Sequence, residues 1–315
     1  MPVASEFGVE SLAYVGIRAV LSLCSVLLLG ALALRFVVLR RYAGPDADVL
    51  RAASDVQLAR WIDGLGVVAV VATFARLGAQ HAAVFGADVK PSAESLSTLL
   101  FRAGWGRSWW VAIASAATVT WLAPRLRSAT PSHWAAASAA VLVFAATQPW
   151  SGHPAAAAMP LLAIAAQLVH IIGAGGWIGS LALLTFVSVP AAIRIGSDGG
   201  GDPDLRVAAL LRAFSPTALL FAAFLGVTGL ATAWVNLGGV AALWQSPYGR
   251  TLLVKLSLLA IVAGTGLYNW RRVLPSLGAP SGSAALRRSS LVELGAGLLV
   301  LLVSSMLVAT PMPSE

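Results

Sequence analysis

Long apolar stretches recur along the chain, separated by short segments that carry most of its charged residues. Each stretch can cross a hydrocarbon core of about 30 Å as a helix, which takes roughly 20 residues. The runs are continuously apolar and lack the alternation of membrane strands, so the pattern predicts helices. Eight spans are expected, at 11–38, 62–85, 108–124, 134–150, 160–190, 213–236, 250–270 and 290–309.

The overall composition agrees with this pattern. Hydrophobic residues make up 58% of the 315 residues and charged residues 11%, and the mean hydropathy is +0.82. These values lie far outside the range of soluble globular domains. The chain is therefore expected to be an all-α polytopic membrane protein, surrounded by membrane lipid.

The distribution of Lys and Arg predicts the orientation. Segments after the first, third, fifth and seventh spans carry thirteen arginines, and the opposite segments carry four basic residues. Basic loops stay in the cytoplasm, so both termini are predicted on the outer side of the membrane. The net charge of +8 is then a topology signal, and nucleic-acid binding is not expected. The two sets are Arg40, Arg41, Arg51, Arg60, Arg125, Arg127, Arg194, Arg206, Arg212, Arg271, Arg272, Arg287 and Arg288, against Lys90, Arg102, Arg107 and Arg250.

The chain also carries signs of an internal repeat. The triplets Trp105-Gly106-Arg107 and Tyr248-Gly249-Arg250 both stand at the predicted outer start of a helix. They indicate a single membrane domain, 1–315, built from two four-helix halves, 11–150 and 151–315. An even number of helices in each half gives both halves the same orientation in the membrane.

Histidines are the candidate ligands in this apolar chain. His153 lies in a short turn after the fourth span, His170 lies within the fifth, and His81 lies near the outer end of the second. All three are predicted in the outer leaflet, whereas His133 falls on the cytoplasmic side. An imidazole in a membrane helix is costly and marks a functional site by default. Spacing alone, without an HxH or HExxH motif, leaves both metal ligation and a structural role open.

Several other side chains bear on the site. Cys24, the only cysteine, is a packing residue or a soft ligand for Cu(I). Arg18 and Lys255 either reach toward the outer headgroups or line a polar cavity open to the outside. Trp177 is a packing or interface residue. Near the cytoplasmic face, Asp63 and Glu293 are expected to form ion pairs with Arg35, Arg271 or Arg272.

The second half of the sequence resembles a known family. The resembling residues include the outer SPYGRTLLVKL, the inner YNWRR and the Glu of the last span, within about 212–313. Upstream, SGHPAAA, HIIGAGGWIGSLALL, Arg18 and the WGRSWW region are similar to the same family. This is the copper resistance protein D (CopD) family of bacterial inner-membrane proteins.

The resemblance implies that the protein handles copper, moving it from the periplasm into the cytoplasm. It makes His153 and His170 candidate copper ligands, to which the topology adds His81. Met159 is the nearest thioether, and Asn236, Tyr248, Arg250 and Lys255 would shape the mouth of the site. A periplasmic CopC-like copper-binding partner is expected to be a separate protein. The copper ion is Cu(I) or Cu(II), since imidazole accepts both.

Other functions stay open at this stage. A b-type haem held by His81 and His170 would make the chain a membrane redox protein. A sensory or structural membrane subunit is a third reading. No GxxxxGK[ST] motif occurs, so primary pumping is not expected, and the chain is not expected to be an enzyme.

Overall fold

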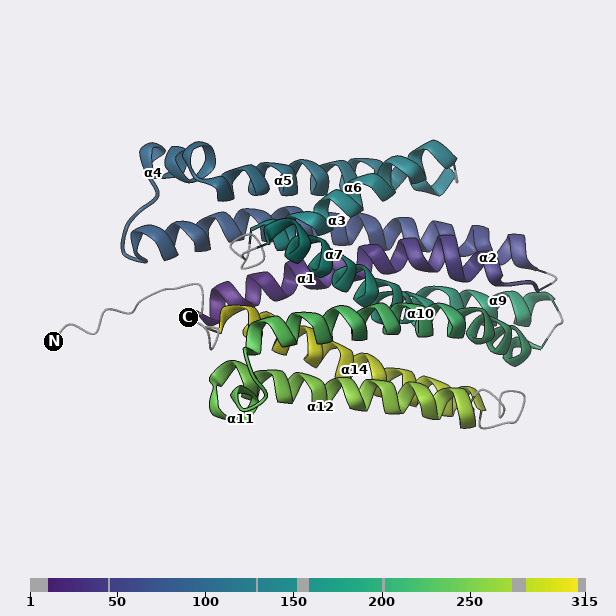
Figure 1. Cartoon of the computed structure of the whole chain (residues 1–315). Coiled ribbons are helices and arrows are strands. Elements are labelled where there is room, and N and C mark those ends of the chain that lie inside the picture. Colours follow the sequence, from purple (N-terminus) through teal and green to yellow (C-terminus); the bar gives the residue numbers. More distant parts are fainter. Residues whose placement is uncertain are drawn as a thin grey trace.

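The structure is a computed structural model, and it describes residues 11–44, 46–128, 130–151, 159–199, 202–273 and 282–310. These residues form helices and short connections, without a strand among them. Figure 1 shows the long helices running side by side along one direction, with α1 beginning and α14 ending at the same end. The prediction of an all-α fold is confirmed.

The long helical segments follow one another in antiparallel order. Two of them contain π-helical turns, η1 in the first and η5 and η6 in the fifth, and η7 follows α12. Short helices α4 and α11 precede α5 and α12. The bounds are α1 Leu12–Ala33, η1 Leu34–Val38, α2 Leu39–Arg41, α3 Ala47–Phe85, α4 Ala93–Ser97, η2 Thr98–Arg102, α5 Gly104–Leu122, η3 Ala123–Ser128, α6 Pro131–Trp150, α7 Pro160–Ala174, η5 Gly175–Gly179, α8 Ser180–Leu183, η6 Leu184–Ser188, α9 Val189–Gly199, α10 Pro203–Leu237, α11 Ala242–Gln245, α12 Pro247–Tyr268, η7 Asn269–Val273 and α14 Gly282–Ala309.

Six of these segments are long and apolar enough to cross a membrane, at Leu12–Arg41, Ala47–Phe85, Pro160–Gly196, Pro203–Leu237, Pro247–Tyr268 and Leu291–Val308. The structure thus supports a multi-pass membrane protein. Two of the eight expected spans, now α5 and α6, are helices of 19 and 20 residues but are not among the six. Both are rich in Ala, Ser and Thr, which lowers their hydropathy. Their crossing of the membrane stays a prediction.

Several helices begin earlier than the hydropathy pattern indicates. The helix expected from residue 62 begins at Ala47, and the helix expected from 213 begins at Pro203. The first turns of both carry charged residues, so they fall outside an apolar window and still propagate the helix. Asp202 caps α10 by accepting from the backbone N–H of Asp204 at 2.9 Å.

Helix α1 lies at the centre of the bundle and contacts α3, η5, α8 and α14. At one point it approaches η5 so closely that their backbones touch. A Cβ at Gly30 would overlap the backbone of Gly179, and a Cβ at Gly179 would overlap the Val26 carbonyl. Small residues allow this approach, as they do between many membrane helices.

By contrast, few residues in the apolar windows of α10 and α12 are fully buried. Leu219, Val227 and Leu230 on α10 are each at least 70% exposed, as is Trp234. Such a surface suits lipid contact, because a large apolar face is costly in water.

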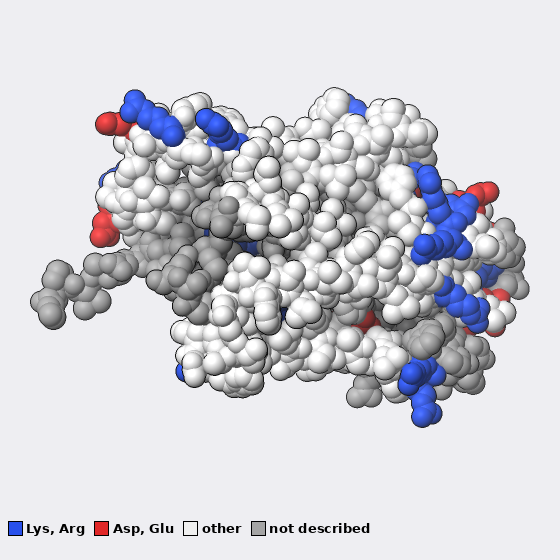
Figure 2. Space-filling view, in the orientation of Figure 1, with Lys and Arg blue, Asp and Glu red and all other residues white. Residues whose placement is uncertain are grey.

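Charged side chains gather at the two ends of the bundle (Figure 2). We call the end with α2, η3, α9 and η7 the arginine-rich end, and the opposite end the α11 end. At the arginine-rich end, Arg206 Nη2 lies 2.6 Å from Asp46 Oδ2, and Arg41 Nη1 donates to Thr217 Oγ1 at 2.9 Å. These contacts connect α10 to the first two long helices.

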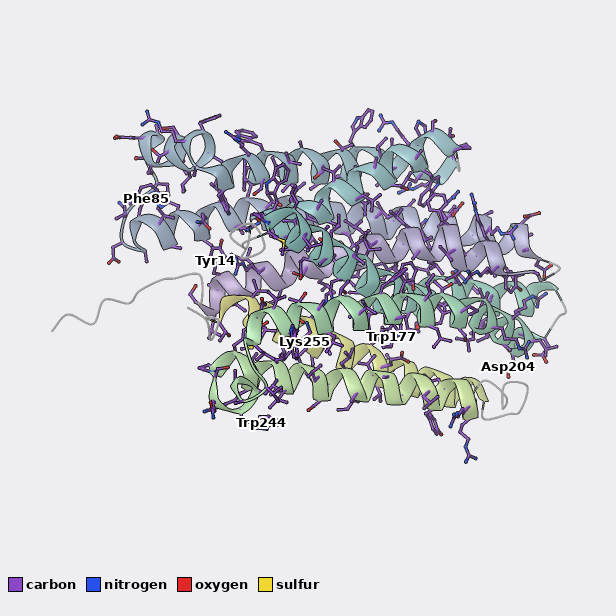
Figure 3. The ribbon with its side chains drawn as sticks, viewed as in Figure 1. Tyr14, Phe85, Trp177, Asp204, Trp244 and Lys255 are labelled. Carbon is purple, nitrogen blue, oxygen red and sulfur yellow. The ribbon has the colours of Figure 1, made fainter. Side chains whose placement is uncertain are left out.

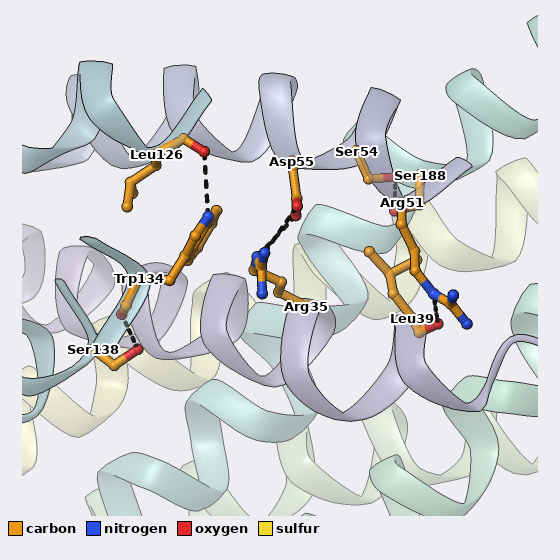
Figure 4. Close-up of polar contacts among 9 residues, drawn as sticks. All are labelled: Arg35, Leu39, Arg51, Ser54, Asp55, Leu126, Trp134, Ser138 and Ser188. Carbon is orange, nitrogen blue, oxygen red and sulfur yellow. Dashed lines mark hydrogen bonds and ion pairs between the residues drawn. The ribbon is translucent and has the colours of Figure 1, made fainter. Parts of the chain in front are cut away.

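An ion pair lies deeper in the bundle (Figure 4). Arg35 Nε is 2.9 Å from Asp55 Oδ1, and the Arg35 guanidinium stacks 4.1 Å from the centre of the Trp134 ring. The expected pairing of Arg35 with Asp63 is wrong, because Asp55 lies two turns earlier on α3 and faces α1.

The two aromatic-Gly-Arg triplets have the same local arrangement. Each stands in the first turn of a long helix, directly after a short one. A Cβ at Gly106 would overlap the carbonyls of Leu99 and Leu100, and a Cβ at Gly249 would overlap that of Ala242. In both places glycine allows the new helix to begin against the backbone of the preceding one.

Candidate functional site

His170 lies on α7 and faces α10. Its Nδ1 is 3.0 Å from Thr228 Oγ1, and that hydroxyl donates its proton to the Phe224 carbonyl at 2.6 Å. Because the only hydroxyl proton is used there, Thr228 accepts from His170 Nδ1–H. The neutral imidazole therefore carries its lone pair on Nε2. Histidines that bind metals typically donate one ring N–H to a neighbouring acceptor, which leaves the other ring nitrogen available as the ligand.

The surroundings of His170 are small and carry one positive group. Gly229 lies beside the ring, and a Cβ there would come within 3.3 Å of His170 Cε1. Lys255, on α12, is close enough for its charge to act on His170. Figure 3 shows Lys255 between α10 and α12. Within the described ranges, Lys255 has no hydrogen bond or ion pair.

His81 has different partners. Its Nε2 lies 2.9 Å from Ser95 Oγ, and its ring lies 4.9 Å from that of Phe85. Ser95 belongs to α4, whose capping box with Ser92 fixes the hydroxyl in place. His81 is only 2% exposed, so this imidazole stabilises the turn between α3 and α4.

His153 lies outside the described residues, but the residue two positions before it is fixed. Arg76, 5% exposed on α3, donates from Nη2 to Ser151 Oγ at 2.8 Å and to the Ser151 carbonyl at 3.4 Å. Arg76 thus anchors the end of α6. Among the described residues, the structure holds no group of three or more His, Cys, Asp and Glu side chains that could bind a metal.

The accessory residues fall into separate places. Met159 is 67% exposed just before α7, and Cys24 is 2% exposed within the hydrophobic core. Asn236 Nδ2 donates to the Tyr248 hydroxyl at 2.9 Å, which ties α10 to α12 near the α11 end.

Two further accessory residues lie at the same end of the bundle. Arg250 Nε donates to the Trp244 carbonyl at 3.1 Å, so it holds α11 against α12. Arg18 lies 5.0 Å from the centre of the Tyr14 ring, and its Nη1 is buried without a hydrogen bond.

Trp177 and Glu293 meet at a polar site that the sequence did not predict. Asn269 Nδ2 donates to Glu293 Oε2 at 3.1 Å, and the Trp177 side chain lies close enough to interact with this carboxyl group. Glu293 is 3% exposed. The expected ion pair of Glu293 with Arg271 or Arg272 is therefore wrong, because the residues in contact with this carboxyl group are neutral. The signal available in the sequence was that all three residues lie in the quoted family-like segments.

Taken together, the long apolar helices and the two comparisons with family models define a membrane protein related to copper resistance. One model, the copper resistance protein D-like N-terminal domain, matches residues 9–159, and the other, copper resistance protein D, matches residues 208–307. The chain belongs to the copper resistance protein D family. No curated protein and no solved structure matches it.

Proposed function

We propose that the protein binds copper from the periplasm and passes it across the bacterial inner membrane into the cytoplasm. Family membership and the six apolar helices support a membrane protein that handles copper. The observation that carries the proposal is His170, whose Thr228 contact leaves Nε2 free within an apolar helix. In this reading the protein binds and transfers an ion and is not an enzyme.

His170 would supply an imidazole ligand along the route of the ion. Imidazole accepts Cu(I) and Cu(II), and the exposed thioether of Met159 would favour Cu(I) at the start of α7. The positive charge of Lys255 opposes long retention of a cation at His170. Weak binding suits transfer, because a transported ion must leave each site as well as enter it.

The full ligand set in this proposal combines His170 with His153 and His81. The contact of Arg76 with Ser151 supports His153 as a ligand, because Ser151 lies two residues before His153. For His81 to join, its ring would have to leave Ser95. His153 is therefore the stronger second ligand.

The proposal also fixes an orientation. The arginine-rich end faces the cytoplasm, and both termini, the start of α7 and α11 face the periplasm. A separate periplasmic CopC-like protein would then deliver copper at the α11 end. All eight long helices, α5 and α6 included, would cross the membrane.

Copper accumulation in cells tests this function. Cells expressing the wild type should accumulate more copper than cells expressing His170→Ala or His153→Ala, at equal protein levels in the membrane. His133→Ala is the matched control, because His133 lies near the arginine-rich end and should leave accumulation unchanged. Equal accumulation in all four strains would exclude import through this site.

An absorbance spectrum tests the haem alternative. The purified protein should lack a Soret band that shifts on reduction with dithionite. If the wild type shows a haem spectrum that is lost in His170→Ala, then His170 binds haem iron and not copper.

A further inference from the structure

The buried carboxyl group of Glu293 has no role in the copper route described above. It lies on α14 within the apolar segment Leu291–Val308, and the residues around it come from three other helical turns. Asn269 comes from η7, Trp177 from η5, and Gly266 from α12, with a Cβ at Gly266 falling 3.4 Å from Glu293 Oε1. Two segments far apart in the sequence, η5 and the junction of α12 with η7, therefore converge on one acid of α14.

The partners of Glu293 do not neutralise a negative charge. Asn269 is a neutral donor and Trp177 is a neutral neighbour, and the three ion pairs among the described side chains involve other carboxylates. Burying a carboxylate without a cation is costly, and the protonated acid avoids that cost. A carboxyl group in this setting is stable with a proton bound or with a cation nearby.

The charged groups on the neighbouring elements lie elsewhere. On α1, one arginine is paired with Asp55 and another lies against Tyr14. On α7 a histidine contacts Thr228, and on α12 a lysine lies near that histidine. The two arginines of η7 are exposed. None of them forms an ion pair with Glu293 in the part of the chain that the structure describes. In the same order they are Arg35, Arg18, His170, Lys255, Arg271 and Arg272.

A second observation is an acceptor without a donor. Asn269 gives its amide N–H to Glu293, while its Oδ1 is buried without a hydrogen bond. A buried unpaired acceptor is uncommon and calls for an explanation. Next to an acid, it increases the negative potential at the site, which attracts a proton or another small cation.

The position of the site fits a transport route. His170 and Trp177 are seven residues apart, so they lie about two turns and roughly 10 Å apart along one helical segment. Trp177 belongs to the π-helical turn η5 and lies near Glu293 of α14. Such turns are frequent at functional sites. Figure 3 shows Trp177 further from the α11 end than Lys255.

The geometry points to Glu293 as a membrane-buried proton site, from which a proton leaves when copper passes inward and to which a proton returns afterwards. This inference rests on the proposed function for its coupling, but proton binding itself does not. The acid gives its proton to water as the copper cation arrives, which leaves the net charge of the site unchanged for Cu(I). After the ion leaves, the carboxylate takes a proton from water, and the cycle closes.

Proton binding can be measured without copper. Infrared difference spectra of the full-length protein during a pH titration should contain the C=O band of a protonated carboxylic acid, and Glu293→Gln should remove that band. Ser305→Ala is the matched control, since Ser305 is also buried on α14 and bonds only within its helix to the Leu301 carbonyl. A spectrum unchanged by Glu293→Gln, with the variant folded, would overturn the proton site.

Coupling is measured in proteoliposomes that contain a pH-sensitive dye. A Cu(I) gradient should drive proton movement in the wild type and in Ser305→Ala, and Glu293→Gln should lose it while still binding copper. Asn269→Ala should keep the infrared band and shift its midpoint pH, which a merely structural amide would not do. Copper transport by the wild type without proton movement overturns the coupling alone. No copper transport by any variant, with the infrared band intact, overturns the proposed function and leaves the proton site standing.

Discussion

At Arg35 a guanidinium is held inside the bundle between the carboxylate of Asp55 and the ring of Trp134. The side chains of the ion pair are only 18% and 10% exposed. Water screens such a pair weakly, so the loss of one partner leaves an uncompensated charge.

We predict that Asp55→Asn destabilises the protein by about 3 kcal/mol, because the Arg35 charge loses its counterion. The apparent melting temperature in detergent measures this loss. Asp48→Asn is the control, since Asp48 pairs with Arg51 but has a side chain that is 96% exposed, and exposed pairs contribute about 0 to 1 kcal/mol. Equal shifts for both variants would contradict the prediction.

Thr228 gives a prediction for the copper site itself. Thr228→Val should weaken copper binding by about tenfold, because the imidazole of His170 loses the oxygen that orients it. Equilibrium copper titration of the purified protein measures the change. Thr265→Val on α12 removes a threonine that bonds only within its own helix and should leave affinity unchanged.

Residue partners were the hardest feature to predict from sequence. The polarity of Glu293 was evident, and an ion pair with a nearby arginine was the natural expectation. Its actual partners, Asn269 and Trp177, depend on how three helices are rotated against one another, which hydropathy does not encode. His170 was found by its cost in lipid, but Thr228 on α10 gave no such signal.

Among the helices, the contact between α1 and η5 sets the tightest packing. The backbones of Gly30 and Gly179 leave no room for a side chain at either position. Packed interiors respond to an added methyl group with shifts that cost about 1 to 3 kcal/mol.

Gly179→Ala should therefore destabilise the protein by about 1 to 3 kcal/mol, through separation of α1 from η5. Thermal unfolding in detergent, followed by circular dichroism, measures it. Gly226→Ala on α10 is the control, because nothing lies within 4 Å of a Cβ there and alanine favours helix. A larger loss for Gly226→Ala than for Gly179→Ala would refute this account.

The existence of the helices followed from the apolar runs, but their ends did not. Helix α3 extends 15 residues before the predicted start at 62, since Ala47–Phe85 is one helix. Polar residues such as Asp48 and Arg51 continue the helix into the ion-pair network at the arginine-rich end, where hydropathy falls.

In the whole molecule, the arginines lie mainly at one end of the bundle, as the loop pattern indicates (Figure 2). The sequence could predict this asymmetry because each loop is short and its charges are local. It could not predict that α1 occupies the centre, since every long helix is similarly apolar and the contacts depend on shape.

Thiol labelling tests the orientation, because Cys24 is the only cysteine and is 2% exposed. In a Cys24→Ser background, a membrane-impermeant thiol reagent added to spheroplasts should label Gln245→Cys, which is exposed on α11. Arg127→Cys, exposed on η3, should be labelled only after the membrane is permeabilised. The reverse pattern would invert the topology and place the termini in the cytoplasm.

The π-helical turns η5 and η6 have a consequence for the phase of the helical repeat. Each turn closes its hydrogen bonds one residue later than an α-helix, so the residues beyond it are rotated by about 100° from where a uniform repeat would place them. Helical phase counted from His170 is therefore out of step beyond η5, and further so beyond η6. A single-residue deletion within either turn should therefore restore a regular α-helix at that turn while the residues of α9 keep facing the same neighbours.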